Sequence, residues 1–218
     1  MEENNIYIPV YIINLPHRKD RLESILGEFE GKNEFDINVI AAHQHEIGDI
    51  GLWKSIQDVI QRATNNNDDV IIICEDDHQF TRYYNKDFLL DNIIEANEQG
   101  CELLCGGISG GFTCIFPLSP HRFWVNSYWG NQFLIVFKKF FPIILNHDFD
   151  ARMKVDHVLS ALTIHKMVLF PFISVQKYFG YSDVTDYNNE NPEWALSRFD
   201  KAFKVLEEFQ TVYNFYSK

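Results

Sequence analysis

Five consecutive apolar residues, followed at once by three acids, set the strongest limit on the fold of this chain. Residues 70–74 read VIIIC, and Glu75, Asp76 and Asp77 come directly after them. A short apolar run bounded by polar residues is typical of a strand covered on both faces, as in a parallel sheet. Ligands bind beyond the carboxyl ends of the strands in such sheets. The sequence therefore predicts a buried strand whose acidic end lies at a binding site.

Strand-like and helix-like segments alternate along the rest of the chain. Strand character marks residues 6–13, 35–42, 101–105, 132–137 and 168–175, and helical periodicity marks residues 22–29, 52–63, 88–96, 140–146, 155–165 and 192–216. Residues 106–129 are predicted to be a long irregular loop. This alternation predicts an α/β fold with a mostly parallel sheet flanked by helices. We expect a single domain over residues 1–218, with a core at about 6–185 and a C-terminal helical extension at about 190–218.

Composition narrows the classes of function. The chain has 19 Lys and Arg against 31 Asp and Glu, a net charge of −12, which disfavours binding to nucleic acid. No stretch approaches the ~20 apolar residues of a membrane span, and the acidic start is unlike a secretory signal, so we expect a cytoplasmic protein. The four cysteines form no CxxC pair, which favours free structural thiols.

Two groups of polar residues are candidates for the site. Glu75 and Asp77 project to the same side of an extended chain, where their oxygens could hold Mg²⁺ or Mn²⁺. Asn14, Arg18 and Arg21 follow the first strand, and an arginine can fork onto phosphate oxygens. The alternatives are a solvated acidic turn in the first case and a solvated helix start in the second.

Together these groups resemble glycosyltransferase family 25, the lipopolysaccharide-biosynthesis type that also includes collagen galactosyltransferases. The opening block is residues 10–21 (VYIINLPHRKDR), and the acidic block is residues 70–77 (VIIICEDD). Between them, residues 51–56 (GLWKSI) match a Gly-plus-helix block, although Ile56 stands where the family has His. Residues 132–145, Val155-Asp156-His157, Gln176 and Ser182-Asp183 follow in similar order, so the resemblance spans residues 7–185.

The resemblance implies a GT-A-like (Rossmann-like) fold and a metal-dependent, inverting hexosyltransferase. The donor would be a UDP-sugar, galactose being one candidate, and the acceptor a glycan or lipid-linked glycan in surface-glycan or lipopolysaccharide biosynthesis. A lipid-linked acceptor would require peripheral association with the inner face of the membrane. The implied roles are metal binding for Asp77 and Glu75, nucleotide binding for Asn14, Arg18, Arg21, Glu75 and Asp76, and general base for Asp156, with Asp183 as the second candidate base.

Other interpretations of the same residues remain open at this stage. The chain could be a non-catalytic sugar-nucleotide or carbohydrate-binding protein, as the Ile56 departure allows, or a metal-dependent phosphohydrolase that uses the same acids. Asp156 could simply favour a helix dipole. The dense aromatic residues Phe123, Trp124, Tyr128 and Trp129 could line an acceptor site or belong to the core.

Overall fold

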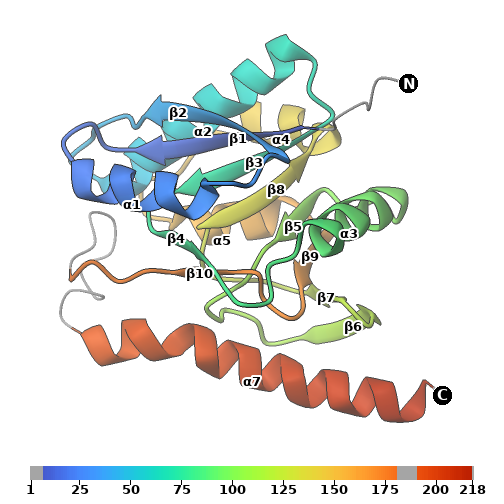
Figure 1. The fold of residues 1–218 in the computed structure, drawn as a ribbon. Helices are drawn as coiled ribbons and strands as arrows, with labels where there is room; N and C mark the ends of the chain where they lie inside the picture. The colour runs from blue at the N-terminus through green and yellow to red at the C-terminus, as the bar shows by residue number, and fades with distance from the viewer. Residues whose placement is uncertain (1–6, 181–190, 218) are drawn as a thin grey trace.

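A mixed eight-stranded sheet forms the centre of the molecule (Figure 1). The computed structural model describes residues 7–180 and 191–217. The sheet has the order β2-β1-β3-β8-β5-β9-β7-β6, and all its strands except β8 and β7 run in one direction. The strands are β1 (Ile8–Asn14), β2 (Phe35–Ala41), β3 (Val70–Glu75), β5 (Leu103–Cys105), β6 (Ile115–Ser119), β7 (Arg122–Val125), β8 (Phe133–Phe137) and β9 (Lys166–Leu169). The predicted α/β class with a mostly parallel sheet is confirmed.

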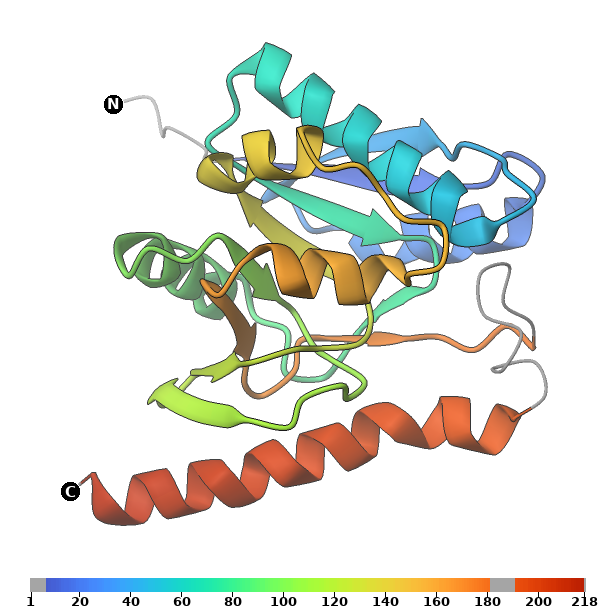
Figure 2. The same cartoon turned by 180° about the vertical axis from the view of Figure 1, so that it is seen from behind.

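Helices cover both faces of this sheet, as the two opposite views in Figures 1 and 2 show. One face carries α1 (Lys19–Phe29) and α3 (Lys86–Glu98), and the other carries α2 (Gly48–Asn66), α4 (Phe141–Leu145) and α5 (Val155–Leu162). Strand β3 serves both faces, since Ile71 and Ile73 pack in the core beneath α2 while Ile72 and Cys74 pack in the core beneath α1. The apolar run at residues 70–74 is therefore buried on both sides, as predicted.

The predicted C-terminal helix is present as α7 (Pro192–Tyr216) and runs along one side of the molecule (Figure 1). Phe199, Ala202 and Leu206 are buried and join the core that contains α2, α4 and α5. Burying these side chains ties the helix to the sheet and brings its amino-terminal turns toward the carboxyl ends of β1 and β3. That the whole chain forms one domain stays a prediction.

Two sequence predictions need correction. Residues 106–129 are not wholly irregular, since β6 and β7 form an antiparallel hairpin within them. The predicted strand at residues 168–175 is two strands: β9 ends at Leu169, and β10 (Ser174–Gln176) pairs with β4 (His78–Phe80) in a separate two-stranded sheet. The interruption coincides with Pro171, which cannot donate a hydrogen bond to a ladder.

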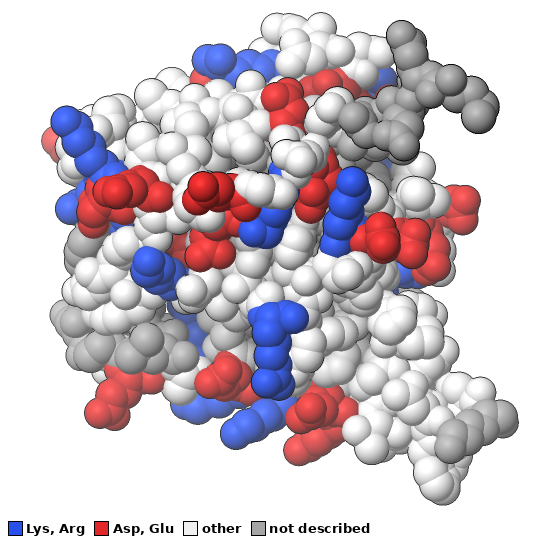
Figure 3. All heavy atoms as spheres, in the orientation of Figure 1, with Lys and Arg blue, Asp and Glu red and all other residues white. Residues whose placement is uncertain are grey.

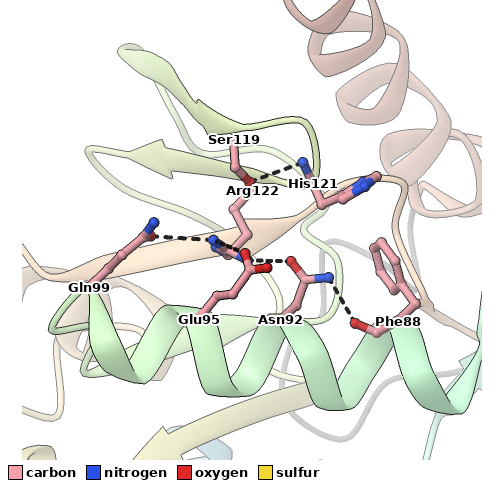
Figure 4. Close-up of polar contacts among 7 residues, drawn as sticks. All are labelled: Phe88, Asn92, Glu95, Gln99, Ser119, His121 and Arg122. Atoms are coloured by element: carbon pink, nitrogen blue, oxygen red, sulfur yellow. Dashed lines mark hydrogen bonds and ion pairs between the residues drawn. The ribbon is translucent and has the colours of Figure 1, made fainter.

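The unexpected hairpin is joined to α3 by the buried Arg122 (Figure 4). Its guanidinium donates to the side-chain oxygen of Asn92 and forms an ion pair with Glu95 at 2.7 Å. Gln99 accepts a longer hydrogen bond at 3.5 Å. A buried guanidinium needs such partners, because an unpaired buried charge is costly. The network therefore fixes where the hairpin sits on the sheet.

The structure also bears on the predictions of free cysteines, of the charged surface and of the absence of a membrane span. All four cysteines are free, and Cys74, Cys101 and Cys105 are buried. On the face seen in Figure 3, basic side chains lie interspersed among acidic ones. Among residues 7–180 and 191–217, no helix has both the length and the apolarity needed to cross a bilayer.

Candidate functional site

A cleft of about 530 Å³ opens at the carboxyl ends of β1, β2 and β3. Ile13, Ala42 and Glu75 mark these strand ends in its wall. The start of α5, the loop before β8, the end of β10 and the first turns of α7 contribute the other walls. Of the predicted site residues, Arg21, Glu75, Asp76, Asp77 and Asp156 all line this one cleft.

Asp76 is held firmly by two residues from the opening block. The side-chain amide of Asn14 donates to Asp76 Oδ2 at 2.8 Å, and Arg21 Nη1 lies 3.0 Å from Asp76 Oδ1. All three side chains are buried, and Arg21 also lies 5.0 Å over the ring of Phe179. Both Asp76 oxygens thus have donors, so Asn14 and Arg21 position the acidic segment. Arg18, in contrast, is not among the described residues that line the cleft.

Glu75 and Asp77 are in a different electrostatic state. Burial and the charge of Asp76 raise the pKa of Asp77 to about 7, even though Arg21 and Arg198 act in the opposite direction. Burial and the charges of Asp77, Asp76 and Asp156 likewise raise the pKa of Glu75 well above its ordinary value. Asp77 Oδ1 is shielded from solvent and has no hydrogen-bond partner. Crowded carboxylates with a free oxygen are the donor set that a hard divalent cation prefers.

Few side chains of the cleft could bind such a cation directly. Within residues 7–180 and 191–217, no three or more His, Cys, Asp and Glu side chains converge as a ready metal site. Mg²⁺ commonly binds through one or two carboxylates and completes its shell with water and substrate phosphates. Glu75 and Asp77 therefore fit a cation whose binding is completed by substrate.

Asp156 lies in the first turn of α5. Hydrogen bonds between residues 129–130 and residues 156–157 hold its carboxylate in place. Gly130 N–H donates to Asp156 Oδ2 at 3.2 Å, and Trp129 Nε1–H donates to His157 Nε2 at 2.7 Å. The His157 N–H also donates to Asp156 Oδ1 at 2.8 Å. Burial raises the pKa of Asp156. A carboxylate held in place with a raised pKa is suited to accept a proton.

The C-terminal helix supplies two cleft residues that the sequence analysis missed, Trp194 and Arg198. Their four-residue spacing places both on one side of a helix. The guanidinium of Arg198 lies 5.4 Å from the centre of the Trp194 ring. Burial lowers the pKa of Arg198, while the nearby charges of Asp77, Asp156 and Glu75 raise it. The spacing was visible in the sequence, but the docking of the helix beside the acids was not.

Several other candidates lie elsewhere. Phe123 and Tyr128 are fully buried in the core, and of the four aromatic candidates only Trp129 lines the cleft. His78, which follows Asp77 in the chain, is buried as well; its Nδ1 lies 2.7 Å from Ser174 Oγ, and burial lowers its pKa to about 3. Asp183 and Ser182 lie outside the described residues.

Comparison with known proteins gives weak similarities only. No protein-family model and no curated protein matches the chain. A glycosyltransferase involved in the glycosylation of the major capsid of PBCV-1 aligns with a TM-score of 0.41 and 11% identity, over 63% of each chain. An apo UDP-glucose pyrophosphorylase aligns with a TM-score of 0.46 and 10% identity, over 91% of this chain and 82% of that one. A putative glucose-1-phosphate thymidylyltransferase from Bacillus anthracis gives 0.38 and 14%, over 70% and 62%. These values assign neither a family nor an activity.

Proposed function

We propose that the protein is a metal-dependent, inverting glycosyltransferase of the family 25 type that transfers a hexosyl group from a UDP-sugar to an acceptor hydroxyl. The observation that carries this proposal is the grouping of Glu75, Asp77 and Asp156 in one cleft at the strand ends, with an unpartnered oxygen on Asp77. A solvated acidic turn would not leave carboxylate oxygens buried and crowded, because such burial costs free energy.

Glu75 and Asp77 would hold Mn²⁺ or Mg²⁺, which supplies neutralisation of the diphosphate leaving group. Asn14 and Arg21 would position this acidic segment through their contacts with Asp76. The ion pair of Arg21 with Asp76 removes one negative charge from the cluster, and the Asn14 amide fixes the orientation of the Asp76 carboxylate. Removing either partner would shift the segment that carries both proposed ligands.

Asp156 would take the proton from the acceptor hydroxyl. The acceptor oxygen then forms its bond to the anomeric carbon as the bond from that carbon to the phosphate oxygen breaks, and the electron pair leaves with the nucleoside diphosphate. Attack from the face opposite the leaving group inverts the anomeric centre. The hydrogen bonds from Gly130 and His157 keep the carboxylate in place for this transfer. Asp183 remains the second candidate base.

The family resemblance alone supports a proposal for the acceptor, the pathway and the cellular location. We propose a glycan or lipid-linked glycan acceptor in surface-glycan or lipopolysaccharide biosynthesis, in the cytoplasm or at the inner membrane face. Trp129 and Trp194, with ring centres 6.5 Å apart in the cleft, offer apolar surfaces of the kind that sugar rings contact.

The test is a thermal-shift and turnover screen of UDP-, GDP- and CMP-sugars with and without Mn²⁺. We expect one donor class to raise the melting temperature in a Mn²⁺-dependent way, and Asp77→Ala to lose that response. Asp91→Ala, at an exposed position of α3, is the matched control. Binding without transfer to any sugar acceptor would favour a binding protein, and phosphate release from simple esters would favour a phosphohydrolase.

A further inference from the structure

We infer that Arg198 of the C-terminal helix binds the β-phosphate of the donor, so that α7 completes the donor site. This inference rests on the proposed function. The family resemblance covers residues 7–185, and Arg198 lies outside them, in α7. Arg198 thus lies on the C-terminal helix, whereas the other proposed donor-binding residues lie at or shortly after the carboxyl ends of β1 and β3.

The side chain of Arg198 is oriented by its own helix and by β10. It lies 5.4 Å from the ring centre of Trp194 and 5.7 Å from that of Phe199. One Nη donates to the side-chain oxygen of Gln176 in β10. Phe199 is itself part of the buried core, so this support is rigid. An arginine held this way has lost most of its side-chain freedom before any ligand arrives.

Arg198 also retains capacity to donate hydrogen bonds. Its Nε is shielded from solvent and has no hydrogen-bond partner. An unsatisfied buried donor is costly, and a phosphate oxygen would satisfy it together with a neighbouring Nη in the two-pronged geometry that guanidinium groups form. Because Arg198 lines the cleft, an anion that enters there can reach this guanidinium.

The other described Lys and Arg side chains of the cleft wall are already engaged. Arg21 pairs with Asp76 at 3.0 Å, and Lys154 pairs with Asp49 at 2.8 Å. The exposed Lys177 donates to the Ser24 hydroxyl at 2.7 Å. Arg198 differs from Arg21 and Lys154 because its side-chain partner Gln176 is neutral, and within residues 7–180 and 191–217 no carboxylate forms an ion pair with it.

The position of Arg198 indicates which phosphate it meets. Its charge interacts with those of Asp77 and Glu75, the proposed cation ligands, and with that of Asp156, the proposed base. The phosphate that leaves the anomeric carbon must lie between the cation and the base, and that phosphate is the β-phosphate. Arg198 would thus stabilise the charge that develops on the leaving oxygen as the glycosidic bond to phosphate breaks.

The experiment measures binding of UDP, GDP and CDP to the full chain in Mn²⁺ by calorimetry, and then compares the tightest diphosphate with its monophosphate. For Arg198→Gln we expect a loss of about 10-fold to 100-fold in affinity for the diphosphate, and a much smaller loss for the monophosphate. Arg198→Lys should fall between the wild type and Arg198→Gln, since it keeps the charge but loses the fork. Lys204→Gln, at an exposed position of the same helix, should bind as the wild type does.

Equal diphosphate affinity in the wild type and both Arg198 variants would overturn the inference while leaving the proposed function intact. So would equal losses for the diphosphate and the monophosphate. If no nucleoside diphosphate binds the wild type, the proposed function fails together with this inference. Should Arg198→Gln fail to fold, Arg198→Lys decides: diphosphate binding equal to the wild type overturns the inference, and selective weakening supports it.

Discussion

At the scale of single residues, three adjacent acids have two different roles. Asp76 is neutralised by Arg21 and accepts a hydrogen bond from Asn14, whereas the half-buried Glu75 and Asp77 form no ion pair within the described part of the chain. Folding thus places charge where it is unfavourable for the isolated protein. Sites that store such strain commonly trade stability for function.

Replacing Asp77 by Asn should stabilise the metal-free protein. Because the folded-state pKa of Asp77 is raised to about 7, the folded protein loses stability as the pH rises from about 4 to about 7. Asp77→Asn removes this loss, so we expect a gain of about 1–3 kcal/mol in the free energy of unfolding at pH 8 with EDTA, shrinking toward pH 4. Urea denaturation at both pH values measures it. Asp91→Asn is the exposed control, and a destabilised Asp77→Asn protein at pH 8 would contradict the interpretation.

Glycine positions show a second residue-scale effect. A Cβ on Gly107 would lie 2.1 Å from the carbonyl oxygen of Ser174, so the glycine is required for close packing of β10. We expect Gly107→Ala to destabilise the protein by about 3 kcal/mol or more through overpacking. Gly27 in α1 has no atom within 4 Å of such a Cβ, so Gly27→Ala should instead stabilise by about 0.5–1 kcal/mol. Denaturation of both variants tests the contrast in sign.

At the scale of elements, the β6–β7 hairpin depends on one buried guanidinium. Arg122→Ala would leave the buried Asn92 side chain without its donor and would remove the partner of the exposed Glu95 carboxylate (Figure 4). We expect a loss of about 1–3 kcal/mol in the free energy of unfolding, which is the typical cost of leaving a buried polar group unsatisfied. Arg82→Ala, at an exposed position, is the control and should change stability by less than about 0.5 kcal/mol. Similar values for the two variants would mean that the network does not anchor the hairpin.

At the scale of the whole molecule, the C-terminal helix is both a core element and a wall of the cleft. Leu206 is fully buried in the main core, while its neighbour Val205 is 37% exposed. Leu206→Ala should cost about 2–5 kcal/mol in the free energy of unfolding, and Val205→Ala less than about 1 kcal/mol. Chemical denaturation compares them. A small effect of Leu206→Ala would indicate that α7 is only loosely docked, which would also weaken the assignment of Arg198.

What could be predicted from the sequence was local. Side-chain periodicity determines single elements: the apolar run at residues 70–74, the helical spacing in residues 52–63 and the long helical pattern from Pro192. The rule that ligands bind at the carboxyl ends of strands predicted that Glu75, Asp77 and Arg21 lie at one edge of the sheet. Contacts between residues far apart in the chain decide three other features. These are the reversed direction of β8, the hairpin within residues 106–129, and the position of Trp194 and Arg198 beside these acids. Periodicity carries no information about which distant element a face will meet, so packing alone decided those features.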